Sequence, residues 1–296
     1  MEIRHIMGQY QKDRLKWIYD ISEQSNILEQ AEIIFTYKVS ISQLQKAKNL
    51  KWIQLSSSGW EHIPATKLKD SGIIVTNAAG VGDTEVAHYI LTAVLMLSRN
   101  MHTVFRNQLN KHWEKIPATS LLGKNILFLG TGRFCQEAAR LLSSFQVNCF
   151  AINRSGQCRG SFSNVWTINK LHELLPKADY LINALPVTTK TRNIIGREEI
   201  NLLKQSCSLI QIGRAATVDE TALYKALSTK SISKALIDVY WQEPLTPEQK
   251  WYSLENVILT PHMASLTEDY NRQITELFFK NINQYLKGAD LINRII

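Results

Sequence analysis

The chain has 296 residues, which is the length of two ordinary domains. Hydrophobic residues make up 45% of it, enough for two cores, and the formal net charge is +8. A membrane protein is disfavoured because no apolar run reaches the roughly 20 residues that span a bilayer. The N-terminus has no apolar signal-peptide segment, and the four cysteines have no C-x-x-C spacing. A disulfide-rich secreted domain and a zinc site are therefore disfavoured as well. The Lys and Arg residues are spread along the chain, which argues against a nucleic-acid surface and favours either a solvated basic surface or attraction of small anionic ligands. We therefore expect a cytoplasmic protein without a metal site, nucleic acid or membrane as partner.

Residues 1–65 have the pattern of a small α/β unit, and one more short strand follows at Ile73–Val75. Four strands and two helices are predicted, in chain order at Ile3–Met7, 15–21, Ala31–Tyr37, Ile41–Lys48, Trp52–Leu55 and Ile73–Val75. A loop of small polar residues, 56–59, follows the third strand. Such loops are favoured places for ligand contacts in open α/β sheets, and an ordinary connection is the alternative.

A long helix is predicted from Asp83 or Thr84, either of which can cap it, to about Arg99. Apolar residues lie nearly all round this helix, which is typical of a buried helix. We expect it to bridge two domains or to be buried in a dimer. The polar residues 101–120 that follow are predicted to cross the surface as a connection.

The most informative stretch spans residues 123–155. An apolar run at Ile126–Leu129 leads into a Gly-Thr-Gly turn, then into a segment with helical spacing and a second apolar run at Val147–Ile152. Glycines at a strand-to-helix turn of a βαβ unit allow a pyrophosphate to approach the helix N-terminus. Cys135 replaces the usual third glycine. The stretch predicts a dinucleotide site, and a purely structural glycine turn is the alternative.

Strand-like and helical runs continue to alternate beyond this unit, which predicts a parallel, doubly wound sheet. The strands are predicted at Tyr180–Ala184, Ser208–Ile212, Lys234–Val239 and Val257–Leu259, and the helices at Ile168–Leu175, Glu198–Leu203 and Asp219–Ser228. The last segment, Leu266–Leu286, is amphipathic and long enough to return to the first domain.

Three residues with ionisable side chains suited to catalysis follow strands of this predicted sheet: Arg214, Glu243 and His262. Each alone is compatible with an ordinary surface or loop residue. Together they suit hydride transfer, because Arg binds a carboxylate through its planar fork, His moves a hydroxyl proton near neutral pH, and a carboxylate supports an imidazolium.

In these segments the chain resembles the D-isomer-specific 2-hydroxyacid dehydrogenase family over nearly its whole length. Seven segments match in order: LSSSGWEHI (55–63), DTEVAHYILTAVLMLSR (83–99), LLGKNILFLGTGRF (121–134), ELLPKADYLINALPVTTKTRNIIG (173–196), LIQIGRAATVDETAL (209–223), LIDVYWQEPL (236–245) and NVILTPHMAS (256–265). The resemblance implies an α/β fold with a Rossmann-type cofactor domain (99–265) and a smaller flavodoxin-like substrate domain (1–98 with 266–296). It also implies a homodimer with the helix at 84–99 near the interface.

The residue patterns and the resemblance together assign an expected role to each candidate residue. The catalytic residues are Arg214, Glu243 and His262. The cofactor-binding residues are Gly130, Thr131, Gly132, Arg133, Phe134, Asn153, Arg154, Ser155, Leu185, Pro186, Thr191, Ile212, Gly213 and Asp238. The substrate-binding residues are Ser58, Gly59, Trp60, Arg214 and His262. Trp60 stands where smaller apolar residues are usual, which predicts a narrower pocket.

We therefore expect an enzyme that moves a hydride between a nicotinamide cofactor and C2 of a 2-oxo acid or D-2-hydroxy acid. Glyoxylate, pyruvate, hydroxypyruvate and branched-chain acids all stay open as substrates. A dinucleotide-sensing regulatory protein, similar to the C-terminal-binding corepressors, is the alternative from another class. A formate dehydrogenase is disfavoured because that branch resembles a Gln–His pair, whereas Glu243 is present here.

The second strand of the glycine unit ends at Asn153, followed by Arg154 and Ser155. NAD-binding units carry an acidic residue here that binds the ribose 2′-OH and would repel a 2′-phosphate. Asn does not repel it, and Arg and Ser can offer a cation and a hydroxyl. NADP is therefore the favoured cofactor and NAD the possible one, with a solvated turn Arg as the alternative interpretation of Arg154.

Overall fold

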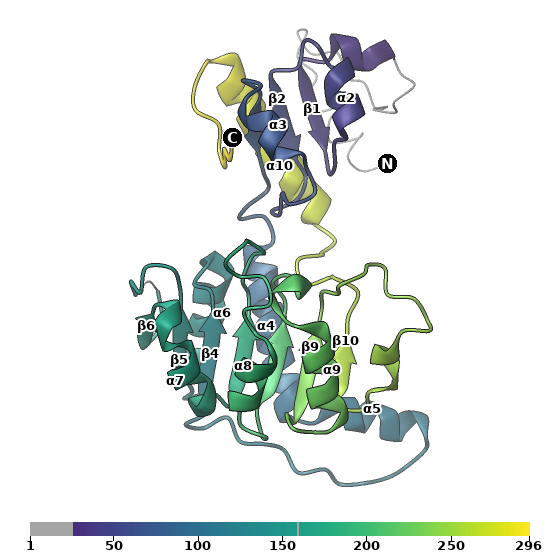
Figure 1. Cartoon of the computed structure of the whole chain (residues 1–296), viewed down its shortest axis with the longest axis vertical. Helices are drawn as coiled ribbons and strands as arrows, with labels where there is room; N and C mark the ends of the chain where they lie inside the picture. The colour runs from purple at the N-terminus through teal and green to yellow at the C-terminus, as the bar shows by residue number, and fades with distance from the viewer. Residues whose placement is uncertain (1–25, 159) are drawn as a thin grey trace. The chain divides into compact units, whose positions relative to one another are not determined.

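The structure is a computed structural model that describes residues 26–158 and 160–296 (Figure 1). The predicted strand Ile3–Met7 and the predicted helix at 15–21 lie outside the described residues. The chain divides into two compact units, one up to Gly82 together with Leu266–Ile296, and the other from Asp83 to Ser265. Each unit has a parallel sheet of its own.

The smaller unit is built on a three-stranded parallel sheet of order β1-β2-β3. Its elements are η1 (Asn26–Gln30), β1 (Ile33–Thr36), α2 (Ile41–Lys46), β2 (Trp52–Leu55), α3 (Ala65–Lys69), β3 (Ile74–Thr76) and α10 (Tyr270–Leu286). Helix α10 comes from the far end of the chain. Its Phe278 stacks on Phe35 of β1 with ring centroids 4.6 Å apart, and its Asn281 donates to Gln54 of β2. These contacts make the C-terminal segment part of the core of this unit.

The larger unit contains a seven-stranded parallel sheet of order β10-β9-β8-β7-β4-β5-β6. The strands are β4 (Asn125–Leu129), β5 (Asn148–Ile152), β6 (Asn164–Trp166), β7 (Tyr180–Asn183), β8 (Ser208–Gln211), β9 (Lys234–Ile237) and β10 (Val257–Leu259). The chain builds outward from β4 to β6 and then continues on the other side of β4 with β7. Ligands bind at this kind of switch point, outside the carboxyl ends of the strands. The predicted doubly wound α/β fold is confirmed.

Helices cover both faces of this sheet (Figure 1). The helical segments are α4 (Asp83–Ser98), α5 (Met101–Leu109), α6 (Arg133–Ser143), η2 (Ile168–Lys170), α7 (Leu171–Leu174), η3 (Leu175–Lys177), α8 (Arg197–Leu202), η4 (Ala215–Thr217), α9 (Glu220–Ser228) and η5 (Lys250–Ser253). On β4, Leu127 and Leu129 face the core shared with α7, α8 and α9, whereas Ile126 and Phe128 face the core shared with α4 and α6. Burial on both faces explains why the strand is a continuous apolar run. No helix among the described residues is long and apolar enough to cross a membrane.

Helix α4 belongs to the larger unit, whereas the sequence prediction placed it in the smaller one. The division falls between Gly82 and Asp83, not after residue 98. The helix buries Ala87, Ile90 and Val94 completely in a core shared with α6 and the seven-stranded sheet. Its apolar composition correctly indicated a buried helix, but composition does not identify the surface that buries it.

Two elements of the larger unit were missed in the sequence. Residues 101–120, predicted as a surface connection, begin with helix α5, which has no buried residue. Strand β6 has only three residues and pairs at the edge of the sheet with β5. Both elements are short and contain no buried residue, so neither leaves a strong apolar periodicity in the sequence.

His102 on α5 predicts how stability depends on pH. Burial, with the positive charges of Lys234 and Arg106, lowers the pKa of His102 from 6.5 to about 4. Because the unfolded chain binds this proton more tightly, the contribution of neutral His102 to stability is present above pH 6.5 and is lost as the pH falls towards 4. We expect His102→Gln to flatten the fall in melting temperature across this window, while His88→Gln, at an exposed position of α4, leaves it unchanged. Identical pH profiles of melting temperature for His102→Gln and wild type would contradict this assignment.

Candidate active site

The glycine turn at the end of β4 has the geometry that an anionic cofactor requires. Gly130 has φ of 107°, a left-handed conformation that favours glycine, and a Cβ there would lie 3.4 Å from the Ala184 carbonyl oxygen. Gly132 is the N-cap of α6 and provides no side-chain cap, so backbone N–H groups of the first turn are left for a ligand. Cys135 is buried in the core beside α4, and burial raises the pKa of its thiol to about 12. The third glycine position is thus filled by an inert core side chain.

Other predicted cofactor residues also follow the carboxyl ends of strands, on two neighbouring strands of the same sheet. Leu185 and Pro186 follow β7, and Ile212 and Gly213 follow β8. A Cβ on Gly213 would lie 2.5 Å from the Leu185 carbonyl oxygen, so the backbones of the two loops are in close contact. The Thr191 hydroxyl donates to the Pro186 carbonyl at 2.6 Å and closes the loop after β7. Phe134 is partly buried against the core of α4 and α6.

Asn153, directly after β5, organises the turn that follows it. Its amide nitrogen donates to the Thr131 hydroxyl and to the Gln157 carbonyl, both at 3.0 Å. Its amide oxygen accepts from the backbone N–H groups of Ser155 and Gly156. The side chain therefore ties this turn to the glycine loop, a role that the sequence did not reveal, and leaves Arg154 and Ser155 exposed at the end of β5.

Arg133, the first residue of α6, is ion-paired with Asp83, the first residue of α4, with 2.8 Å between Nε and Oδ2. Burial raises the pKa of the Asp83 carboxyl group, and Arg133 opposes that rise. The two helix N-termini are thereby linked beside the glycine loop. Sequence reasoning did not connect Asp83 with the site, because its partner lies on a different helix far along the chain and no local pattern marks the pair.

The three predicted catalytic residues follow adjacent strands: Arg214 follows β8, Glu243 follows β9 and His262 follows β10. His262 Nδ1 lies 2.8 Å from Glu243 Oε2, and Glu243 Oε1 accepts from the backbone N–H of Tyr240 at 2.9 Å. The Arg214 backbone is held by the side chains of Gln211 and Thr217, which donate to its carbonyl at 2.9 and 2.7 Å. The structure thus brings Glu243 and His262 into contact and fixes the backbone of Arg214 just after strand β8.

Asp238, predicted to contact the cofactor, is 1% exposed at the end of β9. Its carboxylate accepts from the backbone N–H groups of Met263 and Ala264, immediately after His262. In this structure it therefore holds the loop that carries His262, and its contact with a cofactor stays a prediction.

The loop predicted to bind the substrate carboxylate follows β2 in the smaller unit. The Ser57 hydroxyl donates to the Gly59 carbonyl at 2.8 Å, and Asn77 donates to the Ser58 carbonyl at 2.7 Å. Trp60, next along the chain, is 37% exposed. The loop is thus held by its own polar side chains and presents a partly exposed indole.

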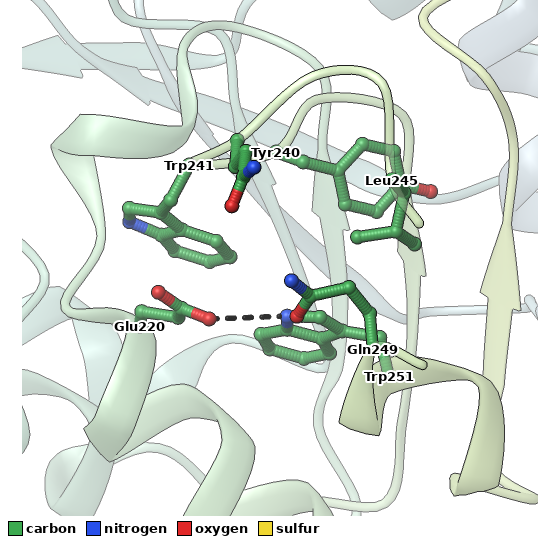
Figure 2. A pocket seen from close by; sticks show the side chains of 7 residues that line it. Glu220, Tyr240, Trp241, Leu245, Gln249 and Trp251 are labelled. Carbon is green, nitrogen blue, oxygen red and sulfur yellow. Dashed lines mark hydrogen bonds between the residues drawn. The ribbon is translucent and has the colours of Figure 1, made fainter. Parts of the chain in front are cut away.

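A pocket of about 240 Å³ lies beside the loop that contains Glu243 (Figure 2). The rings of Trp241 and Trp251 are stacked with centroids 5.4 Å apart, and Trp251 Nε1 donates to Glu220 at 3.3 Å, the dashed line in Figure 2. Trp241 Nε1 donates to the Val218 carbonyl at 3.0 Å. These contacts anchor the segment from 240 to 251 to α9 and to the loop before it.

Comparison with known proteins agrees with this architecture. Residues 91–264 match the D-isomer specific 2-hydroxyacid dehydrogenase family, NAD binding domain. The chain is 32% identical over 263 residues to a glyoxylate reductase of Thermofilum pendens, covering 86% of this chain and 77% of the relative. It is 30% identical over 254 residues to a D-3-phosphoglycerate dehydrogenase of Methanocaldococcus jannaschii, covering 85% of this chain but only 48% of that relative. A D-isomer specific 2-hydroxyacid dehydrogenase family protein of Aeromonas salmonicida, 24% identical over 100% of this chain and 95% of that one, shares the fold with a TM-score of 0.87.

The fold and the match over more than half of the chain define a nicotinamide-dependent oxidoreductase. The chain belongs to the D-isomer-specific 2-hydroxyacid dehydrogenase family, whose substrates are small 2-hydroxy and 2-oxo acids. The resemblance found in the sequence segments is confirmed.

Proposed function

We propose that the protein is an NADPH-preferring reductase that converts small 2-oxo acids into D-2-hydroxy acids. The observation that carries the proposal is the contact between Glu243 and His262, at the same sheet edge as a glycine turn fitted to a dinucleotide. Among the relatives, a glyoxylate reductase is matched over most of its length, whereas a phosphoglycerate dehydrogenase is matched over about half. We therefore favour glyoxylate and hydroxypyruvate as the substrate class.

In the proposed reduction, Glu243, His262 and Arg214 each have a separate role. The cofactor, when bound, supplies the hydride. Glu243 accepts from Nδ1–H of His262 and supports the protonated ring, whose Nε2–H gives its proton to the oxygen that forms at C2 and leaves a neutral imidazole. The guanidinium of Arg214 binds the substrate carboxylate and polarises the adjacent carbonyl group.

A turnover assay tests the proposal. We expect purified protein to oxidise NADPH in the presence of glyoxylate or hydroxypyruvate, with lower kcat/KM for pyruvate and branched-chain 2-oxo acids. Tight binding of NADPH without turnover of any 2-oxo acid would instead support a dinucleotide-sensing regulatory protein.

The cofactor preference rests on the turn after β5. Asn153 stands where NAD-binding units carry an acidic residue, and Arg154 is exposed beside it. Because the Asn153 side chain also holds the turn, Arg154→Ala is a cleaner test than a change at Asn153. We expect kcat/KM for NADPH to fall about 10-fold or more, since a charge-assisted contact to the 2′-phosphate is lost, while kcat/KM for NADH stays unchanged. Equal kcat/KM for the two cofactors in the wild-type protein would contradict the preference and leave the family unaffected.

The homodimer is also part of the proposal, as is the cytoplasmic location expected from the sequence. Large apolar side chains are exposed on α5 and just after it, namely Val104, Phe105, Leu109 and Trp113. Such a patch favours an interface between copies of the chain. We expect light scattering to give twice the 33.8 kDa of one chain, whereas a mass of one chain would contradict the dimer.

A further inference from the structure

The loop that carries His262 is wrapped around one buried carboxylate. Asp238 Oδ1 accepts from the backbone N–H of Met263 at 2.9 Å, and Oδ2 accepts from that of Ala264 at 3.0 Å. Between these contacts and β10, His262 has φ of 51°, in the left-handed region that residues other than glycine rarely adopt. Such a conformation persists only where the surrounding contacts determine it, so the hydrogen bonds to Asp238 fix the backbone of His262.

A second chain of hydrogen bonds reaches the same carboxylate from the other side of His262. The Thr260 hydroxyl lies 2.7 Å from Asp238 Oδ1 and also contacts the hydroxyl of Tyr89. A hydroxyl has one proton to donate, and a carboxylate only accepts. Thr260 therefore donates to Asp238, and Tyr89 must donate to Thr260. The order of donation is therefore Tyr89 to Thr260 to Asp238, and the Tyr89 hydroxyl also lies 3.5 Å from Asp238 Oδ1 itself.

Tyr89 reaches this loop from a rigid element. It lies on α4, whose neighbouring residues Ala87 and Ile90 are completely buried in the core shared with the sheet and α6. Burial, together with the negative charge of Asp238, raises the pKa of the Tyr89 hydroxyl well above its usual value. The hydroxyl therefore keeps its proton and stays a donor at any pH at which the enzyme works.

We propose that Tyr89 is a positioning residue for the reaction, whose hydroxyl fixes the loop of His262 through Thr260 and Asp238. Among the described residues, the hydroxyl is hydrogen-bonded to Thr260 and Asp238 and not to Glu243, His262 or the glycine turn, so its effect on the chemistry passes through the position of His262. This inference rests on the proposed reductase function, because it names a residue on which that reaction depends.

Tyr89→Phe removes the hydroxyl and leaves the ring. We expect kcat for reduction of hydroxypyruvate to fall about 10-fold, the equivalent of one lost hydrogen bond, with KM for the acid and Kd for NADPH within about twofold of wild type. Thr260→Val is expected to give the same loss, and Thr260→Ser, which keeps the hydroxyl, to restore nearly wild-type kcat. The double variant Tyr89→Phe/Thr260→Val is expected to lose less than the product of the two single losses, because both break one chain of hydrogen bonds. Tyr180→Phe, which removes the hydroxyl of a buried tyrosine on β7, is the matched control and is expected to keep wild-type kcat.

Wild-type kcat in Tyr89→Phe would overturn the inference. Two further results would also overturn it, because they would indicate a general structural role. One is equal losses in kcat and NADPH binding in Tyr89→Phe, and the other is a kcat in Thr260→Ser as low as that in Thr260→Val. If the wild-type protein turns over no 2-oxo acid, the proposed function fails, and the side-chain NMR signals of the histidines then test the inference alone. Tyr89→Phe is expected to shift the ring signals of His262 and leave those of His172 unchanged; unshifted His262 signals would overturn it.

Discussion

His262→Ala is expected to lower kcat by about 10²–10⁴-fold, the contribution typical of a positioned acid–base group. In the proposed mechanism the imidazole is the proton donor, placed by Glu243 with 2.8 Å between Nδ1 and Oε2, and alanine offers no replacement. Binding of NADPH should stay within about twofold of wild type, because the glycine turn and α6 are untouched. Stopped-flow oxidation of NADPH and a fluorescence titration measure the two quantities.

His172→Ala is the control for that experiment. His172 lies in the same unit, is about half exposed and is paired with Glu198 and Glu199. Its removal should leave kcat unchanged. A His262→Ala variant with near wild-type kcat would show that another group supplies the proton.

Arg214→Lys is expected to lower kcat/KM for a 2-oxo acid by about 10²-fold, because an ammonium group cannot reproduce the two parallel hydrogen bonds of a guanidinium to a carboxylate. The backbone of residue 214 should keep its place, since Gln211 and Thr217 hold its carbonyl oxygen and not its side chain. Arg192→Lys, at an exposed position after β7, is the control. Unchanged kcat/KM in Arg214→Lys would mean that the substrate carboxylate binds elsewhere.

The sequence predicted the elements whose signals are local. The glycine turn after β4 stands out because strand, turn and helix follow one another without interruption, and each has a distinct apolar pattern. Strands β7, β8 and β9 are buried along their whole length and β10 is half-buried, so each forms a short, mainly apolar run that ends where a polar or special residue begins. That pattern alone places Arg214, Glu243 and His262 after strand ends.

Contacts between residues far apart in the sequence could not be predicted in this way. Tyr89 meets Asp238 and Thr260 from positions 149 and 171 residues away, and Arg133 meets Asp83 from a different helix. Each of these side chains looks ordinary in its own segment. Only the packing of α4 against the sheet and against α6 brings the partners together.

Helix α4 shows the same limit for domain boundaries. The apolar composition of α4 correctly predicted a buried helix. It did not identify the partner, because a neighbouring domain, a second chain or the sheet that follows in the sequence could each bury such a helix. The structure assigns it to the sheet that follows and places the division at Gly82, where the backbone φ of 79° requires glycine.

The most direct test of the account is the configuration of the product formed from hydroxypyruvate and NADPH by the wild-type protein. We expect one equivalent of D-glycerate for each NADPH oxidised, measured by chiral chromatography, with product formation slowed by about 10²–10⁴-fold in His262→Ala. Formation of L-glycerate, or oxidation of NADPH without glycerate, would contradict the account.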